Sequence, residues 1–184
     1  LVKERANELG LLREHLPEVR YIGEVGLDAS PRHYASFESQ KQVFETILRD
    51  CASLGGKVLS IHSVRAVRVV LDMIEACLPR LRGTPVLHWF TGTMTEAKRA
   101  VGLGSYFSIN SEMLQNNRHR SMVASLPLDR ILTESDGPFT KVEGRDARPA
   151  DVRYTVEELA RLRAIPSQEL SEIIVDNLKR IVSP

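Results

Sequence analysis

The stretch YIGEVGLD, residues 21–28, decides the fold, because it has the composition of a buried strand interrupted by one charge. Ile22 and Val25 suit the interior of a sheet, and Asp28 ends the apolar run. Glu24 places a carboxylate inside this run, and a buried carboxylate needs a cation or several hydrogen-bond donors close by. Two explanations stay open from this stretch alone: a salt bridge to a neighbouring Arg or Lys, or a functional site.

The rest of the chain alternates apolar runs of strand length with segments that have the spacing of an amphipathic helix. Strands are expected at residues 20–27, 57–62, 84–90, 105–110 and 129–136. Helices are expected at residues 2–16, 36–54, 65–78, 93–101, 112–125, 149–163 and 167–182, and a polar loop at 137–148. Short apolar strands that alternate with helices form βα units around a parallel sheet, so the sequence predicts an α/β fold.

The composition is that of a globular domain, with 184 residues of which 42% are hydrophobic and 27% charged. The formal net charge is +1, so any affinity for nucleic acid has to come from a local basic patch. Cys51 and Cys77 lie on expected apolar helix faces, which favours buried thiols in a reducing compartment over a disulfide framework. No apolar run has membrane-spanning length and no signal peptide is recognised, so a cytoplasmic protein without a membrane partner is expected.

The sequence contains neither G-x-G-x-x-G nor G-x-x-x-x-G-K-[ST], so nothing supports a dinucleotide-binding or P-loop protein. It shows no internal repeat, low-complexity stretch or linker, and residues 1–184 are expected to form a single domain. The function therefore has to be sought in polar residues that the fold brings together.

Four residues that can bind a metal ion fall toward the carboxyl ends of the expected strands. Glu24 lies in the first strand, His62 ends the second, His88 lies near the end of the third, and Asp136 ends the fifth. In a parallel sheet or barrel all strand carboxyl ends open on one face, so these side chains are expected to converge. Two imidazoles and two carboxylates suit zinc, manganese or iron, and carboxylates can bridge the paired metals that act on phosphoesters.

Each of these residues also has a simpler explanation. A lone His at a strand end is more often a hydrogen-bonded structural residue, and Asp136, which precedes a Gly-Pro pair, also suits a turn. Packing alone gives little reason for all four residues to occur together, so the set favours a metal site. The remaining histidines are assigned no role: His15, His33 and His119.

Four stretches in this order resemble the motifs of the TatD family of metal-dependent deoxyribonucleases, within the amidohydrolase superfamily. GEVGLD resembles G-E-[IV]-G-L-D, and SIHSVRA resembles H-x-R-x-A. LHWFTGT resembles H-x-F-[ST]-G, and LTESDGPF resembles [LI]-x-[ST]-[DE]-[ST]-D-x-P. The final stretch ELSEIIVDNLKRIV is similar to the closing helix of the family, which usually carries an Asn at the position of Asn177. The resemblance runs from about Tyr21 to the end of the chain.

The resemblance implies a (β/α)8 TIM-type barrel that binds two divalent metal ions, with Mg, Mn and Zn as candidates. Carried over to this chain, Glu24 bridges both ions, His62 and His88 complete one site, and Asp136 binds the other ion and helps to activate the attacking water. Glu24 and Asp136 are then the catalytic residues. The implied activity is hydrolysis of DNA phosphodiester bonds, from an end or on a single strand.

The chain departs from the family pattern at two places. The family has a His-x-His or His-x-Asp pair in its first strand, and this sequence contains no such pair. Because a barrel takes roughly 250 residues, we expect an N-terminally truncated barrel with about the last six βα units. The family also has an Arg two residues after the first His, where this chain has Val64, so a phosphate contact is expected to shift to Arg65.

Other substrate contacts follow from residue type alone. Lys141, Arg145 and Arg148 lie in the expected loop and suit either phosphate binding or a solvated surface. Trp89 and Phe90 suit stacking on a base, although neighbouring residues of a strand face opposite ways and at least one of the two is expected in the core.

The variants HWFTGT and ESDGPF resemble TatD-type nucleases of anti-phage cassettes, the Qat type. This resemblance implies a role in antiviral defence and partners among the proteins of a defence complex. Two alternatives stay open. One is a hydrolase of the same superfamily that acts on amides or esters, because fold does not fix function. The other is an inactive fragment that acts as a binding component.

Overall fold

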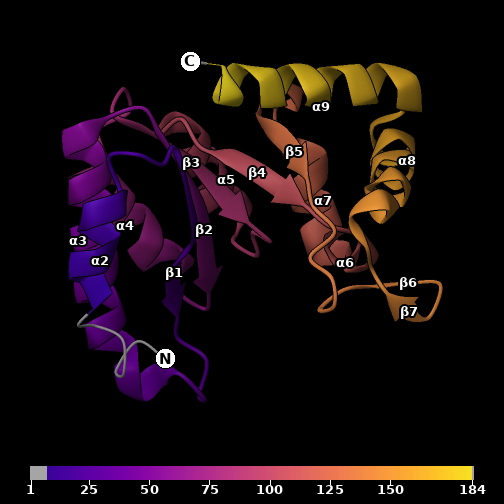
Figure 1. The fold of residues 1–184 in the computed structure, drawn as a ribbon. Helices are drawn as coiled ribbons and strands as arrows, with labels where there is room; N and C mark the ends of the chain where they lie inside the picture. The colour runs from indigo at the N-terminus through magenta and orange to yellow at the C-terminus, as the bar shows by residue number, and fades with distance from the viewer. Residues whose placement is uncertain (1–7, 184) are drawn as a thin grey trace.

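The computed structural model describes residues 8–183 of the chain. Five parallel strands form one sheet, and their order in the sheet, β1-β2-β3-β4-β5, is their order in the sequence. The strands are β1 (Tyr21–Asp28), β2 (Lys57–Val64), β3 (Gly83–His88), β4 (Tyr106–Ile109) and β5 (Ile131–Thr133). Parallel neighbours joined by helices in this order are the arrangement of a (β/α) barrel wall, which Figure 1 shows as a curved sheet.

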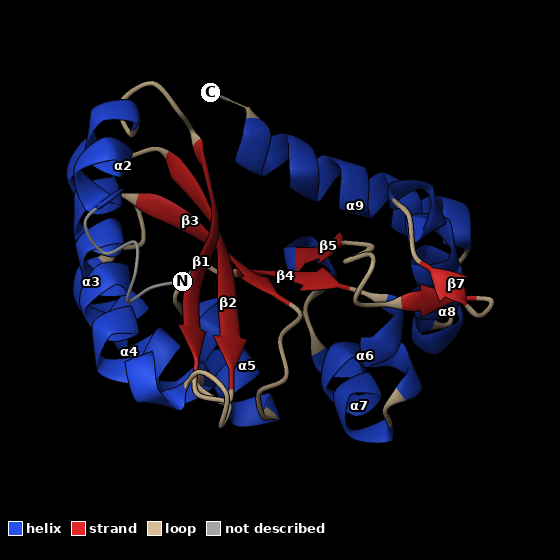
Figure 2. Ribbon diagram, turned by 60° about the horizontal axis from the view of Figure 1, so that its bottom comes forward, coloured by secondary structure: helices blue, strands red, loops and turns tan. Residues whose placement is uncertain are grey.

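Helices surround the outer side of this sheet. Figure 2 shows α2, α3 and α4 beside β1–β3, and α6, α7 and α8 beyond β4 and β5. The α-helices are α2 (Leu9–His15), α3 (Phe37–Leu54), α4 (Val67–Cys77), α5 (Met94–Gly102), α6 (Ser111–Gln115), α7 (Asn117–Ser125), α8 (Val152–Arg163) and α9 (Ser167–Val182). Short 3-10 turns are η2 (Tyr34–Ser36), η3 (Leu128–Arg130) and η4 (Pro149–Asp151). None of the helices in residues 8–183 is both long and apolar enough to span a bilayer.

Alternation along each strand separates an outer from an inner face of the sheet. Leu59 and Ile61 of β2 are buried in the main core with the helices, whereas Val58 lies in a second apolar cluster on the inner face. His62 is an even number of residues from Val58 and therefore shares that inner face. The same strand thus contributes to the core on one side and to the candidate site on the other.

An irregularity in β1 decides where Glu24 lies. The pairing with β2 shifts between Ile22 and Val25, which inserts one extra residue into β1. Ile22 and Leu27 are an odd number of residues apart, yet both lie in the core against the helices. The extra residue at Gly23–Glu24 makes this possible, and it leaves the Glu24 side chain outside the core.

At the amino ends of the strands the inner face is apolar and is covered by α9, which runs across this end of the sheet in Figure 1. The inner-face cluster consists of Val58, Val86, Tyr106, Leu132 and Ile181. Asn177 of α9 is fully buried and donates from its amide to the carbonyl oxygens of Leu128 and Ile131, at 2.7 and 2.9 Å. The α9 helix is therefore fixed to the start of β5 by hydrogen bonds as well as by apolar contacts.

The structure corrects several expected elements. The helix expected at 112–125 is two helices, because Asn116 has an extended backbone and its side chain accepts hydrogen bonds from the N–H groups of Arg118 and His119. The expected loop at 137–148 contains a hairpin, β6 (Lys141–Val142) with β7 (Arg145–Asp146). Its two turn residues, Glu143 and Gly144, both have positive φ, as a type I′ turn requires.

The number of units also differs from the expectation. Residues 8–183 contain five parallel strands in the sheet, and so five βα units where about six were expected. The helix expected at 2–16 is α2 from Leu9, and the remainder of that expectation lies outside the described residues.

Candidate metal centre

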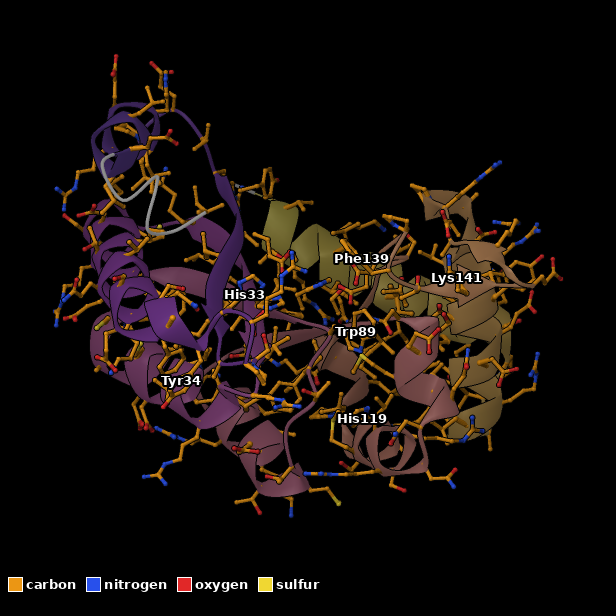
Figure 3. All side chains as sticks on the ribbon, turned by 90° about the horizontal axis from the view of Figure 1, so that it is seen from below. His33, Tyr34, Trp89, His119, Phe139 and Lys141 are labelled. Atoms are coloured by element: carbon orange, nitrogen blue, oxygen red, sulfur yellow. The ribbon has the colours of Figure 1, made fainter. Side chains whose placement is uncertain are left out.

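The four expected ligands come together at the carboxyl ends of the strands. Glu24, His62, His88 and Asp136 all line one cavity of about 520 Å³. The rest of its lining is Ser63, Val64, Trp89, Thr91 and Phe139. Figure 3 views the molecule from this side, with Trp89 and Phe139 near the middle of the view.

Three of these residues are close enough to share one ion. One ligand atom each of Glu24, His62 and His88 lies within 4.8 Å of the other two. A Glu24 oxygen is 2.7 Å from His62 Nδ1 and 3.7 Å from His88 Nε2. One carboxylate and two imidazole nitrogens at this separation form a donor set that suits zinc or a similar divalent ion. The residues present therefore fit a metal ion.

Asp136 approaches the same histidine from the segment that follows β5. Its Oδ1 lies 3.6 Å from His88 Nε2, so that nitrogen faces both the Glu24 and the Asp136 carboxylates. Two carboxylates about one imidazole nitrogen repel each other unless a proton or a cation lies between them. This geometry favours a cation in the cavity.

Glu134 holds His88 in place from behind. Its Oε2 lies 2.7 Å from His88 Nδ1, and its Oε1 accepts hydrogen bonds from the Trp89 N–H at 3.1 Å and the Asn110 side-chain amide at 3.0 Å. With its proton on Nδ1, His88 directs the lone pair of Nε2 into the cavity, as a metal-binding histidine does. Glu134 was assigned no role from the sequence, although it stands within the LTESDGPF stretch.

The surroundings shift the pKa values of the site in opposite directions. The hydrogen bond with His62 holds the pKa of Glu24 below its usual value, against the effect of burial. Burial raises the pKa of Asp136, and the neighbouring Glu134 and Glu24 charges add to this effect. Burial also lowers the pKa of His88, but the hydrogen bond to Glu134 and the nearby carboxylates outweigh it, and the net pKa is raised. The two expected catalytic carboxylates thus differ in their readiness to take up a proton.

Asp28 lies next to His62 at the margin of the site. Its Oδ2 is 3.9 Å from both His62 Nε2 and His33 Nε2, and its Oδ1 accepts the Ser30 N–H at 2.7 Å. Burial raises the pKa of Asp28, but the hydrogen bonds from Ser30 outweigh this and lower it overall. His33, which was assigned no role from the sequence, therefore borders the candidate site, whereas His119 does not line the cavity.

Backbone conformations at the strand ends are unusual. Positive φ occurs at one residue after each of three strands: Arg65 after β2, Trp89 after β3 and Asp136 after β5. Their φ values are 51°, 39° and 48°. Non-glycine residues rarely adopt this region, and such strain gathers at functional sites when the surrounding structure enforces it. At Trp89 the enforcing contact is the hydrogen bond from its N–H to Glu134.

Unlike the expected ligands, the expected substrate contacts Arg65 and Phe90 do not line the cavity. Phe90, expected to contact substrate, is fully buried, packs edge-on against Phe107 with ring centres 5.2 Å apart, and does not line the cavity. Trp89 lines the cavity instead. Arg65 is exposed just beyond β2 but does not line the cavity.

Two of the three basic residues of the 137–148 segment are paired with acidic side chains, and the third, Arg148, lies at its end. Lys141 pairs with Asp146, and Arg145 makes a two-pronged contact with Asp151 at 2.7 and 2.8 Å. The backbone N–H of Arg148 also donates to Asp151, at 2.8 Å. These contacts support a structural role for Arg145 in bracing the segment that follows Asp136.

Comparison with known proteins identifies the family of this chain. The family model described as TatD related DNase matches residues 2–183. The chain belongs to this family. It is 28% identical to the deoxyribonuclease Tat-D of Schizosaccharomyces pombe over 88% of this chain and 61% of that protein. It is 30% identical to the 3′-5′ ssDNA/RNA exonuclease TatD of Pantoea vagans over 97% of this chain and 71% of that protein.

A solved structure also agrees with the fold of this TatD-family chain. This chain superimposes on the crystal structure of the TatD homologue YJJV from Escherichia coli with a TM-score of 0.82 at 25% identity. The match covers 94% of this chain and 69% of that one. Together with this likeness, the parallel five-stranded sheet assigns the chain to the TIM-barrel fold class. The chain spans 61%, 64% and 66% of the length of the first three curated relatives it matches.

Proposed function

We propose that this protein is a divalent-metal-dependent phosphodiesterase that hydrolyses DNA, acting on single strands or ends. The observation that carries the proposal is the cluster of Glu24, His62 and His88 within 4.8 Å, with Asp136 beside it in one cavity. Family membership supports the reaction class, and the printed names of relatives, a deoxyribonuclease and a 3′-5′ ssDNA/RNA exonuclease, support nucleic acid as the substrate.

In this proposal each residue has a separate task. Glu24, His62 and His88 would hold a divalent ion, which would supply Lewis acidity toward a phosphoryl oxygen. Glu134 orients His88 through Nδ1. Asp136, which lines the same cavity and lies beside His88, accepts the proton of the attacking water.

The proposal includes two divalent ions, with Mg, Mn and Zn as candidates. Its support is that His88 Nε2 lies between two carboxylates, Glu24 and Asp136, so the cavity has acidic groups on two sides. Titration of the metal-free protein with Mn²⁺ by calorimetry, together with elemental analysis, is expected to give two ions per chain. A ratio of one would remove the second ion from the proposal.

The activity is tested with a 5′-labelled single-stranded oligonucleotide incubated with Mg²⁺, Mn²⁺ or Zn²⁺, with EDTA as the blank. Progressive shortening that EDTA abolishes is expected. N-acyl amino acids and aryl esters are tested in parallel. Turnover of these compounds with an uncut oligonucleotide would favour the amide or ester hydrolase, and no turnover of any substrate would favour the binding component.

The proposal extends to a cytoplasmic role in anti-phage defence, within a complex of defence proteins. Its support is the pair of sequence variants HWFTGT and ESDGPF. Phage plating on bacteria that express the intact protein is compared with plating on bacteria that express the Glu24→Gln variant. Equal plating on the two strains would remove the defence role and leave the nuclease activity untouched.

A further inference from the structure

Two aromatic side chains share the cavity with the candidate ligands. Trp89 follows His88 directly, and Phe139 lies three residues after Asp136; both line the cavity of about 520 Å³. In Figure 3 they lie near each other on the side where the strands end. The Phe139 side chain is exposed, at 77% for the residue. One aromatic ring therefore follows the candidate ligand His88, and the other follows Asp136 in the next turn.

The backbone after β3 displays Trp89 and buries its neighbour. The φ of 39° at Trp89 breaks the alternation of the strand, and the hydrogen bond from its N–H to Glu134 keeps it in this conformation. Phe90 then packs fully buried against Phe107. The same Glu134 carboxylate orients His88, so the position of the indole is coupled to that of a candidate ligand.

Phe139 is fixed to the catalytic turn in a similar way. Its N–H donates to the carbonyl oxygen of Asp136 at 2.9 Å, and the next residue, Thr140, is fully buried and bonds to the same carbonyl at 3.2 Å. The backbone of Phe139 is thus held while its ring stays exposed. A single exposed aromatic ring is common on protein surfaces. Phe139, however, is held by the turn of Asp136 and lines the same cavity as Trp89 and the candidate ligands.

We propose that Trp89 and Phe139 bind an unpaired nucleobase of the nucleotide whose phosphate lies at the cluster, by stacking on its face. This inference rests on the proposed function and adds the part of the substrate that the site recognises. A cavity of about 520 Å³ has the size of a small-molecule site and accepts one nucleotide, not a duplex. Only an unstacked base presents its face to the aromatic rings. Stacking is tolerant of sequence, so the site selects single strands without selecting a base.

The chain provides its own probe, because Trp89 is its single tryptophan. Binding is measured in the Glu24→Gln variant by fluorescence titration with a thymidine hexanucleotide, in the presence of Mn²⁺. The same titration uses a hexamer with identical phosphates in which every nucleotide is abasic. We expect saturable quenching by the thymidine hexamer, and binding of the abasic hexamer weaker by roughly 5- to 150-fold.

Substitutions at Phe139 separate stacking from mere contact. Phe139→Leu is expected to weaken binding of the thymidine hexamer by the same factor and to leave the abasic hexamer unchanged, whereas Phe139→Tyr keeps the wild-type preference. Tyr34→Ala is the matched control, because Tyr34 is an aromatic residue of similar exposure, 64%, that does not line the cavity. It is expected to change neither titration.

Equal binding of the two hexamers, or an equal loss for both in Phe139→Leu, would overturn the inference. Cleavage by the wild-type protein separates this failure from failure of the proposed function. If the oligonucleotide is cut and base removal does not affect binding, the phosphodiesterase stands and stacking is wrong. If nothing is cut but binding depends on the bases and on Phe139, stacking stands and the proposed reaction is wrong.

Discussion

The two ends of the inner face of the sheet differ although the same strands build both. At the amino end Val58, Val86 and Leu132 pack under Ile181 of α9. At the carboxyl end the same strands, a few residues on, carry His62, His88 and Glu134, and β1 adds Glu24. Glu24, His62 and His88 line a cavity, and Glu134 contacts His88 from behind it.

The difference shows that one strand can serve stability and chemistry at the same time. The amino end buries apolar side chains that stabilise the fold. The carboxyl end gathers carboxylates, histidines and positive-φ residues, each of which has an energetic cost that the packed amino end offsets. Barrel enzymes as a class keep catalysis at the carboxyl face and stability at the other.

The largest expected effect is a loss of cleavage activity when Glu24, at the carboxyl end of the sheet, is changed. Glu24→Gln keeps the size of the side chain and removes the charge that faces His62 and His88. We expect metal-dependent cleavage of a single-stranded oligonucleotide to fall by roughly 10²- to 10³-fold or more, since a stabilising charge is lost from the reaction centre. His119→Gln, at a histidine outside the cavity, is the control. Activity above a tenth of the wild-type rate would remove Glu24 from the catalytic residues.

The strands and the convergence of the candidate ligands could be predicted from the sequence because both depend on local pattern. Apolar runs identified all five parallel strands, and His62 and His88 attracted attention because they lie at or near the ends of such runs. Parallel strands in sequential order then bring those ends together whatever the intervening helices are. Glu24 was found for the same reason, since a charge within an apolar run stands out.

Other features depend on contacts that a pattern does not specify. Glu134 was missed because its role requires knowing that β5 ends at Thr133, one residue earlier, and that His88 lies opposite. The hairpin in the 137–148 segment was missed because its strands have two residues each. The break at Asn116 depends on a cap made by its own side chain, which a helical spacing of apolar residues does not reveal.

The next largest effect is expected at the amino end. Leu132→Ala removes a side chain that is 8% exposed within the inner-face cluster, and it should lower the free energy of unfolding by about 2–4 kcal/mol. Mn²⁺ affinity in the folded protein should stay within about threefold of wild type, because Leu132 does not line the cavity. Urea unfolding and calorimetry measure the two quantities. A loss of affinity in step with stability would mean that the two ends are coupled.

A smaller effect is expected from the residue behind the candidate ligands. Glu134→Gln keeps an oxygen for the Trp89 N–H but weakens the contact with His88 Nδ1. Metal affinity should fall by roughly 10- to 100-fold, as for other residues that orient a metal-binding histidine. Calorimetric titration with Mn²⁺ measures this, and circular dichroism checks that the fold is kept. Unchanged affinity would mean that the position of His88 is set by packing and not by Glu134.

The smallest effect concerns Asp151, which braces the segment that follows Asp136. The hydrogen bonds from Arg145, with that from the Arg148 N–H, hold the pKa of Asp151 well below its usual range. Because the folded pKa is below the unfolded one, about 3.9, Asp151 contributes stability at neutral pH that is lost as the pH falls below about 4. Asp151→Asn should therefore be less stable than wild type at pH 6, and the difference should narrow in acid.

Urea unfolding at several values of pH measures this difference, and Asp146→Asn is the matched control. Asp146 pairs with Lys141 in the same hairpin, but both side chains are more than half exposed, and exposed pairs contribute little. Its stability should follow wild type at every pH. If Asp151→Asn also followed wild type, the pair of Arg145 and Asp151 would not stabilise the 137–148 segment. The position of this segment beside the candidate centre would then depend on Thr140, which is buried and donates its N–H to the carbonyl of Asp136.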